Sequence, residues 1–233
     1  MDNHNWAWKL ILTSFGVYHT SCFRVFAAAS SVGDSVLLTG GIHSKTRTRL
    51  ASSKIYTKDA GLEDFTPLPE ATDYHCQVTI GDTVYVVGGV TAGGVTGNTY
   101  STSLSTKQWV KRSSLNTPRY WHGCNEWDGG IIVVGGKSSN KIESYATLSS
   151  VEKYNPVSDK WSLFTPLPTR MRYMQVLVWA NDIYLVDPHN GDGKPSEKVY
   201  KLRGDTWEVF TSLQIPYTRL IFPAVTLSTI QCT

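Results

Sequence analysis

Two histidines stand at matching places in the chain, and each has a cysteine close by. His75 and His122 each precede a Gly-Gly pair by 13 residues, so we expect them on adjacent, equivalent strands. Imidazole and thiolate groups that converge from neighbouring strands are typical ligands of zinc. Cys76 directly follows His75, however, and successive residues of a strand point to opposite faces. Because no third ligand is evident, we interpret the histidines as hydrogen-bonded core residues and Cys76 and Cys124 as small buried thiols, with no metal site.

The spacing of the cysteines and the overall charge narrow the function classes further. The cysteines are Cys22, Cys76, Cys124 and Cys232, with no C-x-x-C pair, which argues against a structural zinc site and a dense disulfide framework. A net charge of +3 is too small to indicate nucleic acid or an anionic membrane as a partner. Neither a spanning apolar run nor a signal peptide is recognised. We therefore expect a cytoplasmic protein.

Arginines and tyrosines recur beside proline-containing turns. Arginine offers a planar fork that binds a carboxylate through two hydrogen bonds. Arg24 and Arg119 are in register, since each lies 16 residues before a Gly-Gly pair. The alternative is that the arginines are solvated or pair with a neighbouring carboxylate, and that the tyrosines pack between structural units. The candidate partner-binding residues are Arg24, Tyr74, Arg119, Tyr120, Arg170, Arg172, Tyr173, Tyr217 and Arg219.

These residues belong to a repeat with a period of about 50 residues. One element, an apolar run that ends in Gly-Gly, occurs at 36–41, 84–89 and 131–136. A fourth copy at 183–188 ends in Asp187-Pro188 instead. A second apolar stretch and a tight Gly/Asp/Asn turn precede each copy, which predicts a β-hairpin.

Each repeat offers four short strands, which we call a, b, c and d. Strands a and b form the hairpin, and c carries a Tyr in the later repeats. Strand d carries a Trp that lies 20 to 26 residues after the first glycine position: Trp109, Trp161 and Trp207. The first repeat has Leu62 or Phe65 there. A single four-stranded sheet cannot bury both faces, whereas sheets arranged radially bury them against each other, which predicts an all-β propeller.

The combination of Gly-Gly, spaced Tyr and Trp and this period resembles kelch repeats. The segment Ser150-Val-Glu-Lys-Tyr-Asn-Pro-Val-Ser-Asp-Lys-Trp161 is similar to a segment of the kelch domains that follow a BTB domain. The resemblance covers roughly residues 22–220. In such adaptors, arginines near the start of strand a line the central mouth and bind acidic peptide motifs.

We expect one kelch-type β-propeller domain over residues 1–233. The four repeats span about 22–70, 71–117, 118–168 and 169–217. Residues 1–21, with Trp8 on a strand d, and 218–233, with a strand a, would form a partial fifth blade. The alternative is a truncated six-bladed propeller, a fragment of a longer kelch protein.

Topology predicts where a partner binds. The loops between strands b and c and the links between strand d and the next strand a fall on one face, and long loops on a rigid frame often carry recognition. The resemblance implies a protein-interaction module without catalytic residues or cofactor, which recognises substrates for a cullin-type ubiquitin ligase. Its partners would be a protein or acidic peptide and, for a fragment, a cullin-linked adaptor. The alternative is a carbohydrate-active or metal-dependent propeller enzyme of the mutarotase or oxidase class.

Overall fold

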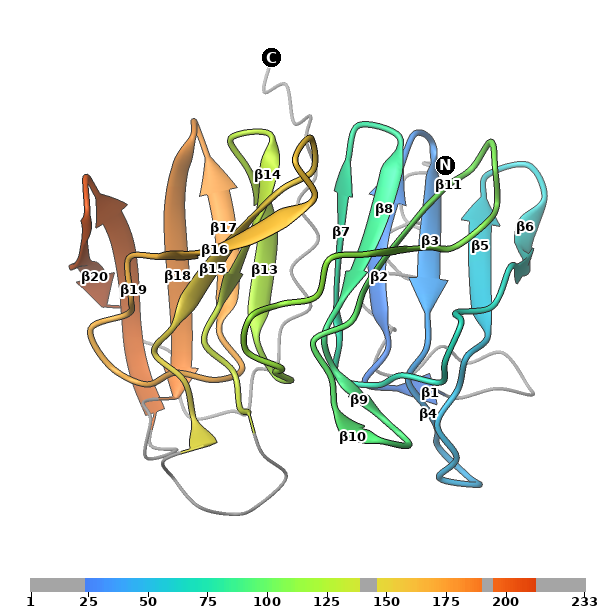
Figure 1. The fold of residues 1–233 in the computed structure, drawn as a ribbon, viewed down its shortest axis with the longest axis horizontal. Helices are drawn as coiled ribbons and strands as arrows, with labels where there is room; N and C mark the ends of the chain where they lie inside the picture. The colour runs from blue at the N-terminus through green and yellow to red at the C-terminus, as the bar shows by residue number, and fades with distance from the viewer. Residues whose placement is uncertain (1–23, 139–145, 190–194, 213–233) are drawn as a thin grey trace, which may run out of the picture.

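The regular structure of the described residues consists of β-strands (Figure 1). The computed structural model describes residues 24–138, 146–189 and 195–212. Four antiparallel four-stranded sheets follow one another along the chain, each ordered as its strands occur in the sequence. We call them blades 1 to 4, and each has strands a to d in chain order.

Blade 1 consists of β2 (Ala28–Val32), β3 (Ser35–Thr39), β5 (Ser53–Thr57) and β6 (Gly61–Phe65). Blade 2 consists of β7 (Cys76–Ile80), β8 (Thr83–Val87), β11 (Thr99–Ser103) and β12 (Val110–Arg112). Blade 3 consists of β13 (Gly123–Trp127), β14 (Gly130–Val134), β15 (Val151–Asn155) and β16 (Lys160–Phe164). Blade 4 consists of β17 (Gln175–Trp179), β18 (Asp182–His189), β19 (Pro195–Arg203) and β20 (Thr206–Ser212).

Two short ribbons complete the described strands. They are β1 (Arg24–Val25) with β4 (Ile42–His43), and β9 (Val90–Thr91) with β10 (Gly94–Val95). The strands of the four blades lie within the four predicted repeats, while the domain boundaries themselves stay a prediction.

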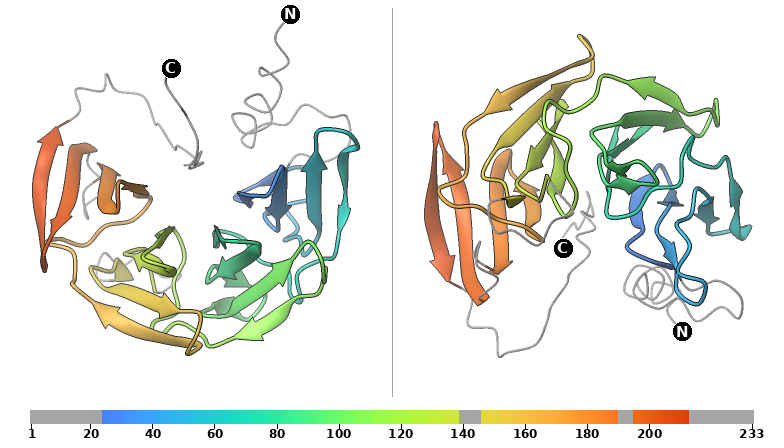
Figure 2. Two further views of the ribbon diagram at one scale, coloured as in Figure 1. Left: turned by 90° about the horizontal axis from the view of Figure 1, so that it is seen from above. Right: turned by 60° about the horizontal axis from the view of Figure 1, so that its bottom comes forward.

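The blades stand side by side around a common centre, with strand a innermost and strand d outermost (Figure 2). The inner strands are neighbours in the order β2, β7, β13, β17. The predicted β-propeller arrangement is confirmed. Seen from above, the described blades form an open ring, and the partial fifth blade predicted from residues 1–21 and 218–233 lies outside the described residues.

The core of the protein lies between blades rather than within any one of them. Leu37 of blade 1 packs with Val84 of blade 2, and Val87 of blade 2 packs with Ile131 and Tyr154 of blade 3. A third and larger cluster joins blades 3 and 4. Burying one such aliphatic side chain contributes about 1.5–3 kcal/mol, so each blade is stabilised mainly by its neighbours.

The Gly-Gly pairs are where neighbouring blades come closest. The second glycine donates its N–H to the link that leads into the next blade: Gly41 to Thr72 O (2.8 Å), Gly89 to Arg119 O (2.8 Å) and Gly136 to Met171 O (2.9 Å). All six glycines have φ between 57° and 101°, a region that glycine enters without strain. A Cβ on Gly40 would lie 2.3 Å from Thr72 O, so the contact excludes any side chain.

The tryptophans of the repeats, with Trp161 and Trp207 in strand d and Trp109 directly before it, make a second contact between blades at the rim. The indole N–H of Trp109 donates to Thr66 O (2.9 Å), that of Trp161 to Ser113 O (2.9 Å) and that of Trp207 to Thr165 O (3.1 Å). Each acceptor carbonyl comes just after strand d of the preceding blade. The repeat needs Trp at this place because the ring covers apolar area while its N–H reaches a backbone acceptor.

Blade 4 departs from the pattern on its far side. Strand β18 continues through Asp187-Pro188 to His189, where the other blades end strand b in Gly-Gly. Proline has no N–H to donate, so blade 4 cannot form the glycine contact with a following blade. Leu177 and Trp179 of β17 and Phe210 of β20 are exposed on this blade.

We predict that Gly89→Ala destabilises the protein by roughly 2–4 kcal/mol, measured by urea unfolding, because two costs add: a strained positive φ and a steric clash. An added Cβ would lie 2.6 Å from Asp73 O. Gly81→Ala is the matched control, since Gly81 also has a positive φ but nothing within 4 Å of the added atom. Equal losses for the two variants would contradict the proposed role of the close contact.

Candidate partner-binding site

The b–c loops and d–a links meet at one end of the ring, which we call the mouth face. It is the end of the molecule with β1, β4, β9 and β10, at the bottom of Figure 1. Backbone bridges join link to loop within a blade: Asp73 pairs with Val90, and Tyr120 pairs with Lys137. An Arg49–Asp73 ion pair joins the b–c loop of blade 1 to the link into blade 2. The loops and links that were expected to share a face therefore do so.

Four aromatic side chains stand one per blade at the mouth face. We call Phe26, Tyr74, Trp121 and Tyr173 the aromatic row. The ring centroids are 4.2 Å apart for Phe26–Tyr74, 5.3 Å for Tyr74–Trp121 and 4.4 Å for Trp121–Tyr173. Tyr120 lies 4.6 Å from Trp121 and is itself buried, which favours a packing role for this residue. The row thus forms a continuous aromatic surface that crosses all four described blades.

The backbone holds the row in an unusual conformation. Phe26, Tyr74, Trp121 and Tyr173 have φ between 55° and 62°, where a bulky side chain is rare. The cause is a chain of hydrogen bonds between blades: Tyr74 N–H to Phe26 O (3.1 Å), Trp121 N–H to Tyr74 O (3.4 Å) and Tyr173 N–H to Trp121 O (2.9 Å). Strain of this kind costs about 1–3 kcal/mol per residue and is concentrated at functional sites.

Positive charge surrounds the row. Lys137 Nζ lies 6.0 Å from the Trp121 ring centre, and the Arg172 guanidinium lies 5.9 Å from that of Tyr173. Apart from Arg24 and Arg119, whose guanidinium groups bind backbone carbonyls, the described cations of the mouth-face loops and links are Lys45, Arg47, Arg49, Lys137, Arg170 and Arg172, against the carboxylates of Glu70 and Asp73. The described a–b and c–d turns at the opposite end reverse this balance, with Asp34, Asp59, Asp82, Asp128, Asp159 and Asp205 against Lys58 and Lys107. The two ends of the ring therefore carry charge of opposite sign.

The row offers neutral hydroxyl groups rather than phenolates. Burial raises the pKa of Tyr74 and, more strongly, the pKa of Tyr173. Burial also lowers the pKa of Lys137, and the charge of Arg172 lowers it further. The tyrosines can therefore donate hydrogen bonds to carboxylates at physiological pH.

Arg119 does not serve as a ligand-binding residue, contrary to expectation. Its side chain is 0% exposed. The guanidinium donates to Gly135 O (2.9 Å), Ser150 O (2.9 Å) and the Glu152 carboxylate (2.6 Å). The same carboxylate accepts the backbone N–H groups of Asn116 and Thr117, which belong to the link that contains Arg119. Burial lowers the pKa of Arg119 and the Glu152 charge opposes that shift. The alternative of pairing with a carboxylate is correct here, and the pair fixes the link onto blade 3.

Arg24 has the corresponding role in blade 1, where its guanidinium binds Gly40 O (3.1 Å), Ser52 O (2.9 Å) and Ser52 Oγ (3.1 Å). Arg170 is exposed, and Arg172 lies half-buried near Thr147. Tyr217 and Arg219 lie outside the described residues.

We predict that Glu152→Ala lowers the free energy of unfolding by about 3–5 kcal/mol, because Arg119 would remain buried without its counter-ion. Chemical denaturation measures this loss. Arg170→Ala is the control and should change stability by less than about 0.5 kcal/mol, as expected for an exposed side chain. A small loss for Glu152→Ala would mean that water reaches Arg119.

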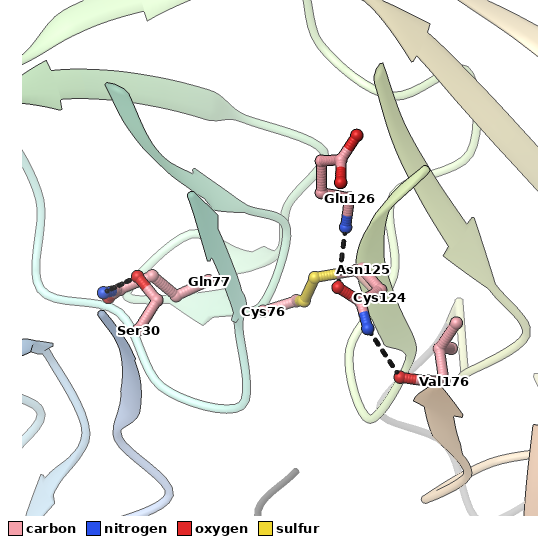
Figure 3. Close-up of a disulfide and its surroundings, with 7 residues drawn as sticks. All are labelled: Ser30, Cys76, Gln77, Cys124, Asn125, Glu126 and Val176. Atoms are coloured by element: carbon pink, nitrogen blue, oxygen red, sulfur yellow. Dashed lines mark hydrogen bonds between the residues drawn. A yellow bond between two sulfur atoms is a disulfide. The ribbon is translucent and has the colours of Figure 1, made fainter. Parts of the chain in front are cut away.

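The histidines and cysteines of the inner strands have structural roles. His75 faces blade 1, where its Nε2 and Thr39 Oγ1 are 2.9 Å apart, while Cys76 faces blade 3, as alternation along a strand predicts. Cys76 and Cys124 form a disulfide between β7 and β13 (Figure 3). The interpretation of the two as separate buried thiols is therefore wrong. Among the described residues, no group of three or more His, Cys, Asp or Glu side chains is arranged to bind a metal.

Stability should fall as the pH drops below about 6.5. Burial lowers the pKa of His75 to about 4, and burial together with the Arg119 charge lowers the pKa of His122 to about 3. Between these values and the unfolded pKa near 6.5 only the unfolded chain is protonated, so each histidine weakens the fold by ~1.4 kcal/mol per pH unit.

The test is urea unfolding of the wild type and His122→Met at pH 7.5 and 5. Met is chosen because Met174 of blade 4 lies beside Gly135 of blade 3 in the same way that His122 of blade 3 lies beside Gly88 of blade 2. The variant should lose part of the pH dependence. An unchanged slope would show that other groups set it.

Sequence reasoning missed Phe26, Trp121 and Lys137. A signal for the first two was available: Phe26, Tyr74, Trp121 and Tyr173 recur with the period of the repeat. The sequence analysis assigned binding to Arg24 and Arg119, two residues before Phe26 and Trp121, and not to these aromatic residues. Lys137 carried no such signal, since only the fold brings it to Trp121.

Comparisons with known proteins agree with this geometry. A family model described as "Kelch motif" matches residues 118–168. Kelch-like protein 36 of Bos taurus is 29% identical over 193 residues, which cover 78% of this chain and 30% of that protein. Kelch-like protein 35 of Mus musculus is 25% identical over 84% of this chain and 33% of that protein.

The chain contains a kelch-repeat domain. It is related to the kelch domains of BTB-kelch proteins, as the sequence indicated. The solved structure of YjhT matches with a TM-score of 0.70 at 16% identity, and the match covers 84% of this chain and 68% of the YjhT chain. At this identity the match supports the fold alone. The chain spans about 30% of the length of Kelch-like protein 36. The described part of the kelch-repeat domain contains no helix long and apolar enough to cross a membrane.

Proposed function

We propose that this kelch-repeat domain is a protein-interaction module that binds an acidic peptide segment at its mouth face. The observation that carries the proposal is the aromatic row with cationic side chains beside it. Rigid aromatic rings are the commonest anchors of protein interfaces because they bury large areas at a low entropic cost. The strained backbone beneath the row is retained at a cost, which supports a function for these side chains.

The ligand chemistry follows from the groups around the row. Arg47 and Arg170 are exposed, and Arg172 is half-buried, so a bound carboxylate would meet guanidinium groups at the rim and tyrosine hydroxyls at the centre. The proposed contacts are Tyr74, Trp121 and Tyr173 from the row and Arg170 and Arg172 from the link into blade 4. Arg119 and Arg24 act indirectly, because they hold the links that present the row.

The biological role within this proposal is substrate recognition for a cullin-type ubiquitin ligase in the cytoplasm. Its support is the relationship to the Kelch-like proteins, of whose length the matched part is about a third. The contact with a cullin-linked adaptor would then belong to a segment beyond the kelch repeats. No observation on the described residues favours the mutarotase or oxidase alternative over this role.

The test is selection of binding peptides from a random display library, followed by affinity measurements on the selected sequences. We expect acidic peptides to be enriched and Trp121→Ala to weaken their binding by roughly 30-fold, the loss typical of a hot-spot residue. Arg172→Ala should weaken binding less and reduce its dependence on salt.

The control is Trp179→Ala, which removes an exposed tryptophan (73% exposed) at the far end of β17 and should leave the affinity unchanged. Circular dichroism confirms that each variant is folded. Peptides without acidic residues, or equal binding by Trp121→Ala and the wild type, would overturn the proposal.

A further inference from the structure

The bond between Cys76 and Cys124 joins the inner strands of blades 2 and 3, β7 and β13. Cys76 is the first residue of β7 in blade 2, and Cys124 is the second residue of β13 in blade 3 (Figure 3). Their Cα atoms are 6.2 Å apart, within the range that a disulfide spans without moving the backbone. The two residues are 48 positions apart in the sequence, so only the docking of the two blades brings them together.

The neighbouring interfaces have reversible polar contacts between their inner strands. Between blades 1 and 2, Gln77 Nε2 and Thr79 Oγ1 donate to Ser30 Oγ (2.9 and 2.8 Å). Between blades 3 and 4, Asn125 Nδ2 donates to Val176 O (3.0 Å). Figure 3 shows the Gln77–Ser30 and Asn125–Val176 contacts on either side of the disulfide. The covalent bond thus occupies, at the middle interface, the place that hydrogen bonds occupy at the other two.

The disulfide also lies close to the aromatic row. Tyr74 precedes Cys76 by two residues, and Trp121 precedes Cys124 by three. The link between these two aromatic residues, from Trp121 N–H to Tyr74 O, measures 3.4 Å, longer than the 3.1 and 2.9 Å of its counterparts. The disulfide therefore restrains the interface at which the row has its weakest hydrogen bond.

Access to the bond differs between its two ends. Cys76 is 9% exposed, whereas Cys124 is half-buried. An external thiol or disulfide would react first at Cys124, because exchange requires an in-line approach to an accessible sulfur.

We propose that Cys76 and Cys124 are a redox-reversible site that clamps blades 2 and 3 together and sets the spacing of Tyr74 and Trp121. Its oxidant is a small disulfide of the glutathione class. The Cys124 thiolate attacks the oxidised glutathione, which releases one glutathione thiolate and leaves a mixed disulfide. The Cys76 thiolate then attacks Cys124 Sγ and releases the second glutathione. Two electrons and two protons pass from the cysteines to give two reduced glutathione molecules, and excess reduced glutathione reverses the reaction.

The first measurement counts thiols in the wild-type chain after equilibration with defined mixtures of reduced and oxidised glutathione. Acid quenching, alkylation and peptide mass spectrometry should show Cys76 and Cys124 changing together, from two alkylated thiols to one linked peptide pair. Both cysteines remaining alkylated in excess oxidised glutathione would overturn the proposal.

The second measurement is hydrogen exchange of the Trp121 amide by NMR, which needs no partner and so stands apart from the proposed function. Reduction should speed exchange at Trp121 about 10-fold or more while the Tyr173 amide, at the interface of blades 3 and 4, stays protected. Reduction should also lower the midpoint of thermal unfolding by roughly 5–10 °C.

Cys124→Ser is the matched variant, and Cys76→Ser replaces it if the first fails to fold. Either should show the fast Trp121 exchange under oxidising and reducing conditions alike. Equal exchange at Trp121 in the oxidised and reduced wild type would show that the disulfide does not set the row, and would overturn that part of the proposal.

Discussion

The structure depends on one close contact, the approach of each Gly-Gly pair to the link that enters the next blade. A single four-stranded sheet has two faces to bury, and the hydrophobic clusters of this protein lie between sheets. Sheets can pack radially only if their inner edges come very close, and at Gly40 and Gly89 no side chain would fit. The second glycine of each pair also donates the hydrogen bond that fixes the next link. The Gly-Gly pair therefore determines both how closely two blades pack and in which direction the chain enters the next blade.

The mouth face is a consequence of that contact. A link held by the glycine of the preceding blade must turn sharply to enter strand a, and the residue at this turn takes a positive φ. In this chain that residue is aromatic in every described blade, so the strained residue of each turn also belongs to the proposed binding surface. The buried Arg119–Glu152 pair stabilises the same link from below. Within a few positions of the sequence, some residues form the proposed ligand contacts and others only hold the link. The two kinds differ in burial, because the residues that hold the link are enclosed by the protein.

The interfaces between blades are similar in geometry but not in chemistry. Besides the apolar cluster that each interface buries, the inner strands of the first interface add a network of hydroxyl, amide and imidazole groups and those of the second add a disulfide. The third adds a hydrogen bond from Asn125 to Val176 O and the thioether side chains of Met171 and Met174. After blade 4 the glycine contact cannot form, because Pro188 has no N–H. The glycine contact therefore joins blades 1 to 4 to one another and cannot extend beyond blade 4. The charge of the described loops and turns is divided between a basic mouth face and an acidic opposite end, although the net charge is small.

The sequence by itself determined the repeat, the four-stranded unit, the hairpin turns and the propeller, because glycine, tryptophan and tight-turn residues have local conformational requirements that recur with the period of the fold. The structure confirmed the positions of these elements and the shared face of loops and links. Only the tertiary structure decided the roles of individual side chains. Arg119 and Arg170 look alike in sequence, yet one is enclosed by Glu152 and the other is exposed. Cys76 and Cys124 carry no pairing motif, and their bond follows from the docking of two blades. Burial, charge pairing and contact between distant residues depend on that docking, and no local pattern encodes them.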